Sequence, residues 1–178
     1  MKKFRPYIFP SIGVLSLLLS VSVFIFQPGK KNVAYVQMES VYNGFQLKSK
    51  LETQLKDTEK ARQFVIDSLK LQLHQMTLTL QSMEKVDTSL LRMYNLRQQY
   101  LNEQEMQFAE DNQALASEYT DQVWGQINQY TRDYGTENGY DYILGASGDG
   151  TVMYANETED ITEDLKVYIN NRFNGGTK

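Results

Sequence analysis

The sequence contains no cysteine, which removes several kinds of structure and chemistry at once. A disulfide framework, a thiol nucleophile, a cysteine-based metal site and a lipid-modified cysteine are all excluded. Histidine occurs once, as His74, and a lone helical histidine is more often a polar surface residue than a ligand. Glycine and proline are both missing between Gly44 and Gly125, so neither of the usual helix breakers interrupts this tract.

The tract without glycine and proline predicts helices much longer than the usual ~11–12 residues. Apolar residues within it recur at alternating steps of three and four, which is the seam pattern of a coiled coil. In the first half the pattern runs through Leu69, Leu73, Met76, Leu80 and Met83. In the second half it runs through Leu115, Tyr119, Val123, Ile127, Tyr130 and Tyr134.

The two apolar stripes are out of phase, and residues 84–89 lie between them. Asp87, Thr88 and Ser89 are favourable N-cap residues, and aspartate and serine compete with the backbone inside a helix. We therefore expect a reversal there, which makes residues 45–134 an antiparallel coiled-coil hairpin. Its two arms should be similar in length, each roughly 60 Å at the helical rise per residue.

The N-terminus carries a long apolar run over residues 8–26, with basic residues before it and Pro28-Gly29 after it. Positive charge ahead of such a segment favours export of the chain beyond it. One interpretation is an uncleaved membrane anchor. The other is a signal peptide cleaved near Ser20 or Ser22, which would leave apolar residues 23–26 at the mature N-terminus. We expect residues 1–31 to be a signal peptide or an anchor with a short linker.

Short β-rich segments flank the predicted hairpin. Residues 33–38 read as a strand, and residues 140–145 and 151–155 read as two strands of a β-hairpin around an Asp-Gly turn. Asp160 and Glu163 match a capping box at the start of a final amphipathic helix.

Residues 32–44 and 135–178 should together form a β-rich assembly body, with Gly135 and Asn138-Gly139 ending the second arm. The predicted fold class is α+β, mostly α. A sheet this small, with open edges, buries too little apolar surface to be stable alone. We therefore expect several copies of the chain to share one core, although this argument does not give their number.

Charge is distributed unevenly along the chain, whose net charge is −4. Residues 60–100 carry six basic and three acidic side chains, whereas residues 101–178 carry four basic and fifteen acidic ones. No basic stripe with interleaved aromatic residues occurs, so a nucleic-acid partner is not expected. No nucleophile–base pair, metal-ligand cluster or phosphate-binding glycine loop is evident, so we expect neither an enzyme nor a cofactor.

The order of short motifs around the hairpin resembles the OmpH/Skp family of periplasmic chaperones. The similarity extends from Val33 to Phe173. The matching segments are residues 33–36, 38–42, 140–145, 152–155 and 160–162, with the long hairpin between the second and the third. Two departures stand out. Gln37 occupies a position that is usually acidic in the family, and this chain is acidic whereas the best-known members are basic.

The resemblance implies a homotrimer with a shared β-barrel body and three helical tentacles that enclose a cavity. Such chaperones hold unfolded outer-membrane β-barrel proteins there without ATP, in the periplasm. This chain would also be tethered to the inner membrane through residues 8–26 if that segment stays uncleaved. The alternative is a membrane-anchored coiled-coil structural or adaptor protein with one specific partner.

The holdase hypothesis predicts two groups of functional residues. Soft apolar and amide side chains near the hairpin tip, with one arginine, would contact the unfolded proteins. These client-binding candidates are Met76, Met83, Met93, Gln72, Gln98 and Arg92. Residues of the predicted strands would carry assembly. These assembly candidates are Val36, Ile143, Val152 and Tyr154.

Overall fold

The computed structural model describes residues 31–85 and 87–176. Its elements are β1 (Val33–Gln37), α2 (Met38–Gly44), α3 (Gln46–Ser82), α4 (Thr88–Asn138), β2 (Tyr142–Ala146), the 3-10 turn η1 (Glu157–Glu159) and α5 (Thr162–Phe173). Residues from Val33 onward form one compact unit. The predicted apolar segment 8–26 lies outside the described residues. No helix within the described ranges is long and apolar enough to cross a membrane.

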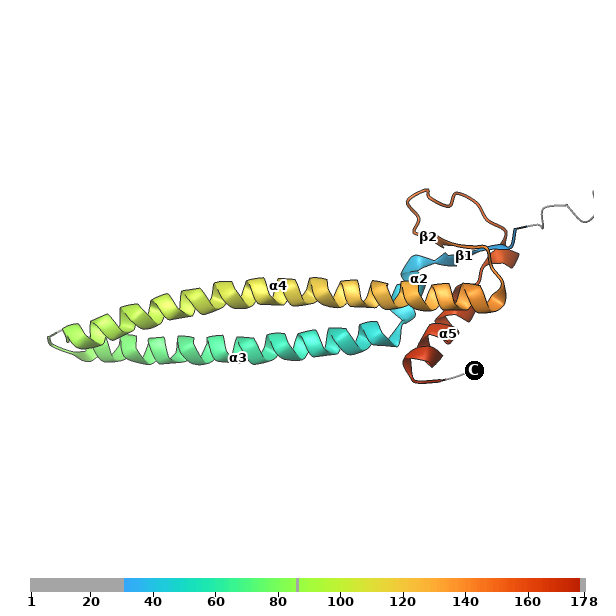
Figure 1. Cartoon of the computed structure of the whole chain (residues 1–178). Coiled ribbons are helices and arrows are strands. Elements are labelled where there is room, and N and C mark those ends of the chain that lie inside the picture. The colour runs from blue at the N-terminus through green and yellow to red at the C-terminus, as the bar shows by residue number, and fades with distance from the viewer. Residues whose placement is uncertain (1–30, 86, 177–178) are drawn as a thin grey trace, which may run out of the picture. The chain divides into compact units, whose positions relative to one another are not determined.

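The two long helices α3 and α4 form the predicted hairpin and run side by side from the end that carries the strands and α5 (Figure 1). The reversal at residues 83–87 is confirmed. Asp87 is the N-cap of α4, and its Oδ1 accepts hydrogen bonds from Ser89 N at 2.8 Å and Leu90 N at 3.4 Å. Hydrogen bonds from the hydroxyl and N–H of Ser89 hold the pKa of Asp87 below its usual value.

Two residues of the predicted seam are buried in each helix, and most of the others are partly buried. A distal cluster contains Ile66, Leu69, Leu73 and Leu101, with Tyr94 and Phe108 packed against it. Val123 and Ile127 are buried nearer the body. Met83 departs from the expected seam, because it lies just past the last helical residue of α3 and is exposed.

The two arms differ in length, which corrects the expectation that they would be similar. α3 has 37 residues and α4 has 51, or roughly 55 and 75 Å at the helical rise. Two features produce the difference: the first arm begins only after the break at Phe45, which separates α2 from α3, and α4 does not stop at Gly135. Gly135 is buried within the helix, and a Cβ there would lie 3.2 Å from Ile143 Cδ1. Gly139, with φ of 71°, ends the helix as predicted.

The sheet is parallel, and the predicted β-hairpin is wrong. β1 pairs with β2 in the register Val33↔Tyr142 to Gln37↔Ala146. Residues 151–155 form no strand. The chain after β2 instead forms a local turn, in which Asp149 Oδ1 accepts a hydrogen bond from Thr151 N at 2.9 Å and the glycines on either side of Asp149 have positive φ.

The body core lies where α2 and α5 pack against α4 and β1. Its fully buried side chains belong to the helices of the body and to the α2–α3 junction. They are Val41, Phe45, Val123, Ile127, Leu165 and Ile169. These contacts fix the root of the hairpin, so the direction in which α3 and α4 leave the body is set by packing.

The predicted last helix is present, but it has no capping box. Asp160 Oδ1 accepts a hydrogen bond from Thr162 N at 2.9 Å, whereas Glu163 pairs with Lys166 at 2.8 Å and does not reach back to the cap. Burial acts to raise the pKa of Asp160, but hydrogen bonds from the hydroxyl and N–H of Thr162 lower it below its usual value.

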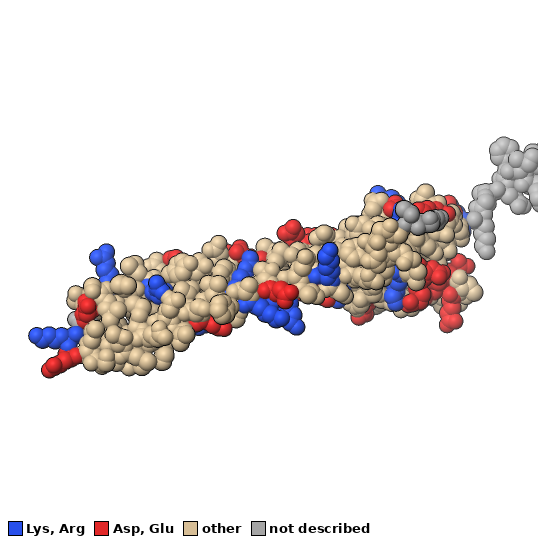
Figure 2. All heavy atoms as spheres, turned by 90° about the horizontal axis from the view of Figure 1, so that it is seen from below, with Lys and Arg blue, Asp and Glu red and all other residues tan. Residues whose placement is uncertain are grey.

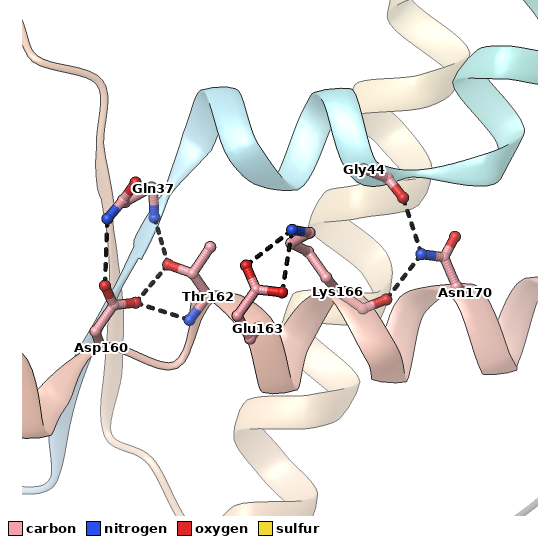
Figure 3. A network of polar contacts seen from close by, with 7 residues as sticks. All are labelled: Gln37, Gly44, Asp160, Thr162, Glu163, Lys166 and Asn170. Carbon is pink, nitrogen blue, oxygen red and sulfur yellow. Dashed lines mark hydrogen bonds and ion pairs between the residues drawn. The ribbon is translucent and has the colours of Figure 1, made fainter.

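Polar side chains of α5 hold both ends of α2 (Figure 3). At one end, Gln37 N donates to Thr162 Oγ1 at 2.9 Å. At the other, Asn170 Nδ2 donates to Gly44 O at 2.9 Å, and Asn170 Oδ1 accepts from Gln46 N at 2.8 Å. Asn170 therefore satisfies backbone groups on both sides of the break between α2 and α3, which would otherwise lack helical partners.

Candidate functional site

The distal part of the hairpin exposes many large apolar side chains on both helices. On α3 they begin about halfway along, and on α4 they occupy the residues after the reversal. The exposed set is Phe64, Val65, Leu71, Leu78, Met83, Leu91, Met93, Leu96, Tyr100 and Met106. Scattered exposed apolar residues are normal on a protein surface, but their concentration on one stretch of a helix pair makes this stretch the candidate interaction surface. We call this set the distal apolar surface.

Three of the α3 members form a stripe with a seven-residue spacing. Phe64, Leu71 and Leu78 recur every two helical turns, so they share one face of α3. The buried seam residues Leu69 and Leu73 lie on a different face. The seam residues hold α3 against α4. The second stripe takes no part in that contact, so it remains available to a partner.

On α4, a separate stripe lines a shallow groove of about 290 Å³. Met93, Leu96 and Tyr100 form its walls together with Arg97. These residues follow each other at steps of three and four, so they lie on one face of the helix. The groove is at the small end of the range for ligand sites, so it fits one or two side chains of a larger partner.

The distribution of charged side chains also changes along the hairpin. In its middle, basic residues are paired across the two helices: Lys70 Nζ lies 2.7 Å from Glu105, and Arg62 Nη2 lies 3.7 Å from Asp111. Beyond these pairs, residues 71–82 of α3 include no lysine, arginine, aspartate or glutamate. Figure 2 shows acidic side chains gathered at the body end of one face and mostly uncharged residues over the distal half.

The structure separates the six client-binding candidates into two groups. Met93, Gln72 and Arg92 are exposed, and so is Met83 at the reversal. Met76 and Gln98 are partly buried, which places them at the edge of the seam between the helices. The exposed group offers a partner the larger contact surface, whereas Met76 and Gln98 offer only part of each side chain.

The leucines of the distal apolar surface were missed by sequence reasoning, which favoured methionine for its flexibility. Leu71, Leu78 and Leu96 are each more than half exposed. For Leu71 and Leu78, a signal was present in the sequence, because their seven-residue spacing with Phe64 runs beside the seam stripe. Two apolar stripes on one helix indicate one partner within the chain and a second one outside it.

The assembly candidates also differ in how far their own chain buries them. Val36 is buried in the body core of its own chain, and Ile143 packs against that core. Val152 is partly buried, whereas Tyr154 is 88% exposed beside Met153 at 87%. Met153 and Tyr154 lie in the segment predicted to be a third strand. The rest of the described chain leaves both of these apolar side chains uncovered.

The acidic side chains do not gather into a metal site in the described part of the chain. Within residues 31–85 and 87–176, no group of three histidine, cysteine, aspartate or glutamate side chains could hold a metal ion. Asp149, between two glycines, uses its carboxylate for the local bond to Thr151 N. The features that distinguish the described surface are thus apolar and electrostatic.

Comparison with known proteins gives a family match and a structural match. The profile of the family described as outer membrane protein (OmpH-like) matches residues 32–169. A search of curated proteins found no match. The fold is similar to that of an OmpH-like protein from Caulobacter crescentus CB15, provisionally described as an outer membrane chaperone. The TM-score is 0.55 at 13% identity, over 82% of this chain and 87% of that one.

Proposed function

Because the chain belongs to the OmpH-like outer membrane protein family, we propose that it is an ATP-independent periplasmic holdase. In this proposal, its clients are unfolded outer-membrane β-barrel proteins, which it keeps from aggregating until they are inserted. The single observation that supports the proposal most is the distal apolar surface on a hairpin that is already closed by its own seam.

The chemistry of this surface suits an unfolded client better than a folded one. Unfolded barrel strands expose alternating apolar side chains and unpaired backbone groups, which drive aggregation. A holdase needs soft, spread-out contacts, and Met83, Met93 and the exposed leucines provide them on both helices. Gln72 and Arg92 add hydrogen-bond donors beside those apolar residues.

The holdase proposal predicts that the purified protein suppresses aggregation of an unfolded outer-membrane β-barrel diluted out of urea. Light scattering measures the aggregation, with an unrelated β-barrel as a second client and no ATP present. Suppression of both is expected, because contacts spread over the distal apolar surface do not depend on the fold of one particular barrel. A protein that protected one barrel only, or neither, would favour the adaptor alternative with a single specific partner.

We also propose that residues 32–44 and 135–178 act as the assembly body of a homo-oligomer, with residues 45–134 as the tentacle. The family resemblance suggests a trimer. Support comes from the outer edge of β2, which no described strand covers, and from the exposed Met153 and Tyr154. In such an oligomer, the segment 151–155 would find in a second copy the strand partner that its own chain does not offer.

Replacing Met153 and Tyr154 together by serine should shift the protein from oligomer to monomer, because it removes apolar surface that only a second copy would cover. Sedimentation velocity at micromolar concentration measures the change. Both side chains are almost fully exposed in the single chain, so its helicity should not change. Phe64→Ser, at a residue 73% exposed on the hairpin, is the control and should leave the oligomer intact. Equal sedimentation of all three proteins would contradict this assembly surface.

The proposed location is the periplasm, with or without a tether. Residues 1–31 would direct export in both cases. The mass of the mature protein distinguishes them, because an uncleaved anchor retains the full N-terminus and a cleaved signal peptide does not.

A further inference from the structure

We propose that the groove on distal α4 selects client segments in which a carboxylate stands beside apolar side chains, and that Arg97 is its specificity-determining residue. This inference rests on the proposed holdase function and names the chemistry of the segments that the hairpin prefers. The groove would favour segments that contain a carboxylate, on an apolar surface that otherwise binds clients without selectivity.

The geometry places one cation among three apolar walls. Arg97 lies four residues after Met93 and three before Tyr100, so all three share one face of α4 with Leu96. Met93 and Leu96 are each 58% exposed, which leaves apolar surface to be covered on both sides of the guanidinium. A segment that covered them would partly dehydrate Arg97, and a carboxylate in that segment would restore its hydrogen bonds.

Charge complementarity identifies the partner, because Arg97 has no acidic neighbour on its own helix to satisfy it. Lys70 and Arg62, farther from the tip, are neutralised by Glu105 and Asp111. In contrast, α4 carries no acidic residue between Asp87 and Glu103, and no described carboxylate pairs with Arg97. Residues 71–82 of α3 supply no carboxylate either. The groove is therefore an apolar site with an unpaired positive charge.

The test uses the full chain in zwitterionic nanodiscs and a pair of labelled peptides. Both peptides alternate leucine or tyrosine with serine, and they differ only in one central residue, aspartate or asparagine. Fluorescence anisotropy gives the two dissociation constants, with empty nanodiscs as the blank. The wild-type protein should bind the aspartate peptide about threefold more tightly, which is typical of an exposed ion pair.

Two variants separate selectivity from affinity. Arg97→Gln should bring the ratio of the two dissociation constants to about one, and Arg97→Glu should reverse the preference. Leu96→Gln should weaken both peptides but retain the preference for aspartate, because it removes apolar contact and keeps the guanidinium. Lys70→Gln makes the same change in net charge as Arg97→Gln, at a residue already paired with Glu105, so its ratio should match that of the wild type.

The outcomes distinguish this inference from the function on which it rests. A wild-type protein that suppresses aggregation but binds both peptides equally overturns the inference and leaves the holdase proposal standing. Discrimination without suppression of aggregation supports the groove and refutes the holdase. A changed sedimentation rate for Arg97→Glu would mean that a second copy covers the groove, which also overturns the inference. If Arg97→Gln lost binding to anionic lipid vesicles while its ratio of peptide dissociation constants stayed at the wild-type value, the groove would bind lipid headgroups. That result would also overturn the inference.

Discussion

Replacing Phe45 by alanine is expected to lower the free energy of unfolding by about 3–5 kcal/mol, because it removes a large aromatic ring from a packed core. Phe45 is completely buried at the break between α2 and α3. Its ring packs edge to face against Tyr130 of α4 and Phe173 of α5, with centroid distances of 6.3 and 5.7 Å. The vacancy would lie at the root of the hairpin. Urea denaturation followed by circular dichroism measures the loss.

The matched control is Phe64→Ala, which deletes the same side chain from an exposed position on the hairpin. Its effect on stability should stay within about 0.5 kcal/mol. Both series must be run at one protein concentration, since dissociation of an oligomer would add to the unfolding free energy. Comparable losses at the two positions would show that Phe45 is not a core residue in solution.

The helical part of the fold was predictable because its signals are local. The spacing of Leu69 and Leu73 defines a face of one helix, and Asp87 caps the next helix through its own near neighbours. The strand positions at 33–37 and 142–146 were also readable from β-branched and aromatic residues. Each of these features depends on residues within a few positions along the chain.

The sheet topology could not be derived in the same way, because it depends on residues far apart in sequence. β1 and β2 are joined by the whole hairpin, and their parallel pairing depends on where α4 ends. The Asp-Gly turn at residues 149–150 suggested antiparallel pairing with residues 151–155, but the strand that pairs with β2 is β1, about a hundred residues earlier in the chain. The length of α4 was also predicted incorrectly, again because it depends on a residue outside the helix. Gly135 lies inside α4, where its lack of a side chain accommodates Ile143 and does not end the helix.

The candidate site could be located from the sequence only as a region of the chain. Net charge and amide content pointed to the distal hairpin, but not to the face that is free there. That face depends on which stripe the partner helix covers, and Met76 lies at the seam while Leu71 and Leu78 do not.

Replacing Leu71, Leu78, Met93 and Leu96 together by glutamine is expected to lower client affinity about tenfold or more. Each side chain is more than half exposed, so the change removes apolar surface that only a client would cover. Glutamine favours helices almost as well as leucine and methionine, so the hairpin should remain folded. Suppression of β-barrel aggregation measures the loss, and helicity is checked in the same sample.

A pair of single substitutions controls for general surface hydrophobicity. Leu96→Gln on the hairpin and Val167→Gln on α5 remove apolar side chains of similar exposure, 58% and 60%, from the two ends of the protein. Only the hairpin variant should weaken capture, and modestly, because binding is spread over many contacts.

Crosslinking gives the independent check on where clients bind. Photoreactive probes at Gln81 and Arg92 lie near the tip, and probes at Glu110 and Glu118 lie closer to the body, all at exposed positions. Preferential capture at the tip is expected, because the exposed leucines and methionines concentrate there, whereas charge alone is screened beyond ~8 Å at physiological salt. Equal capture at both levels, or full activity of the fourfold variant, would refute the distal apolar surface as the client site while leaving a chaperone with a different client surface.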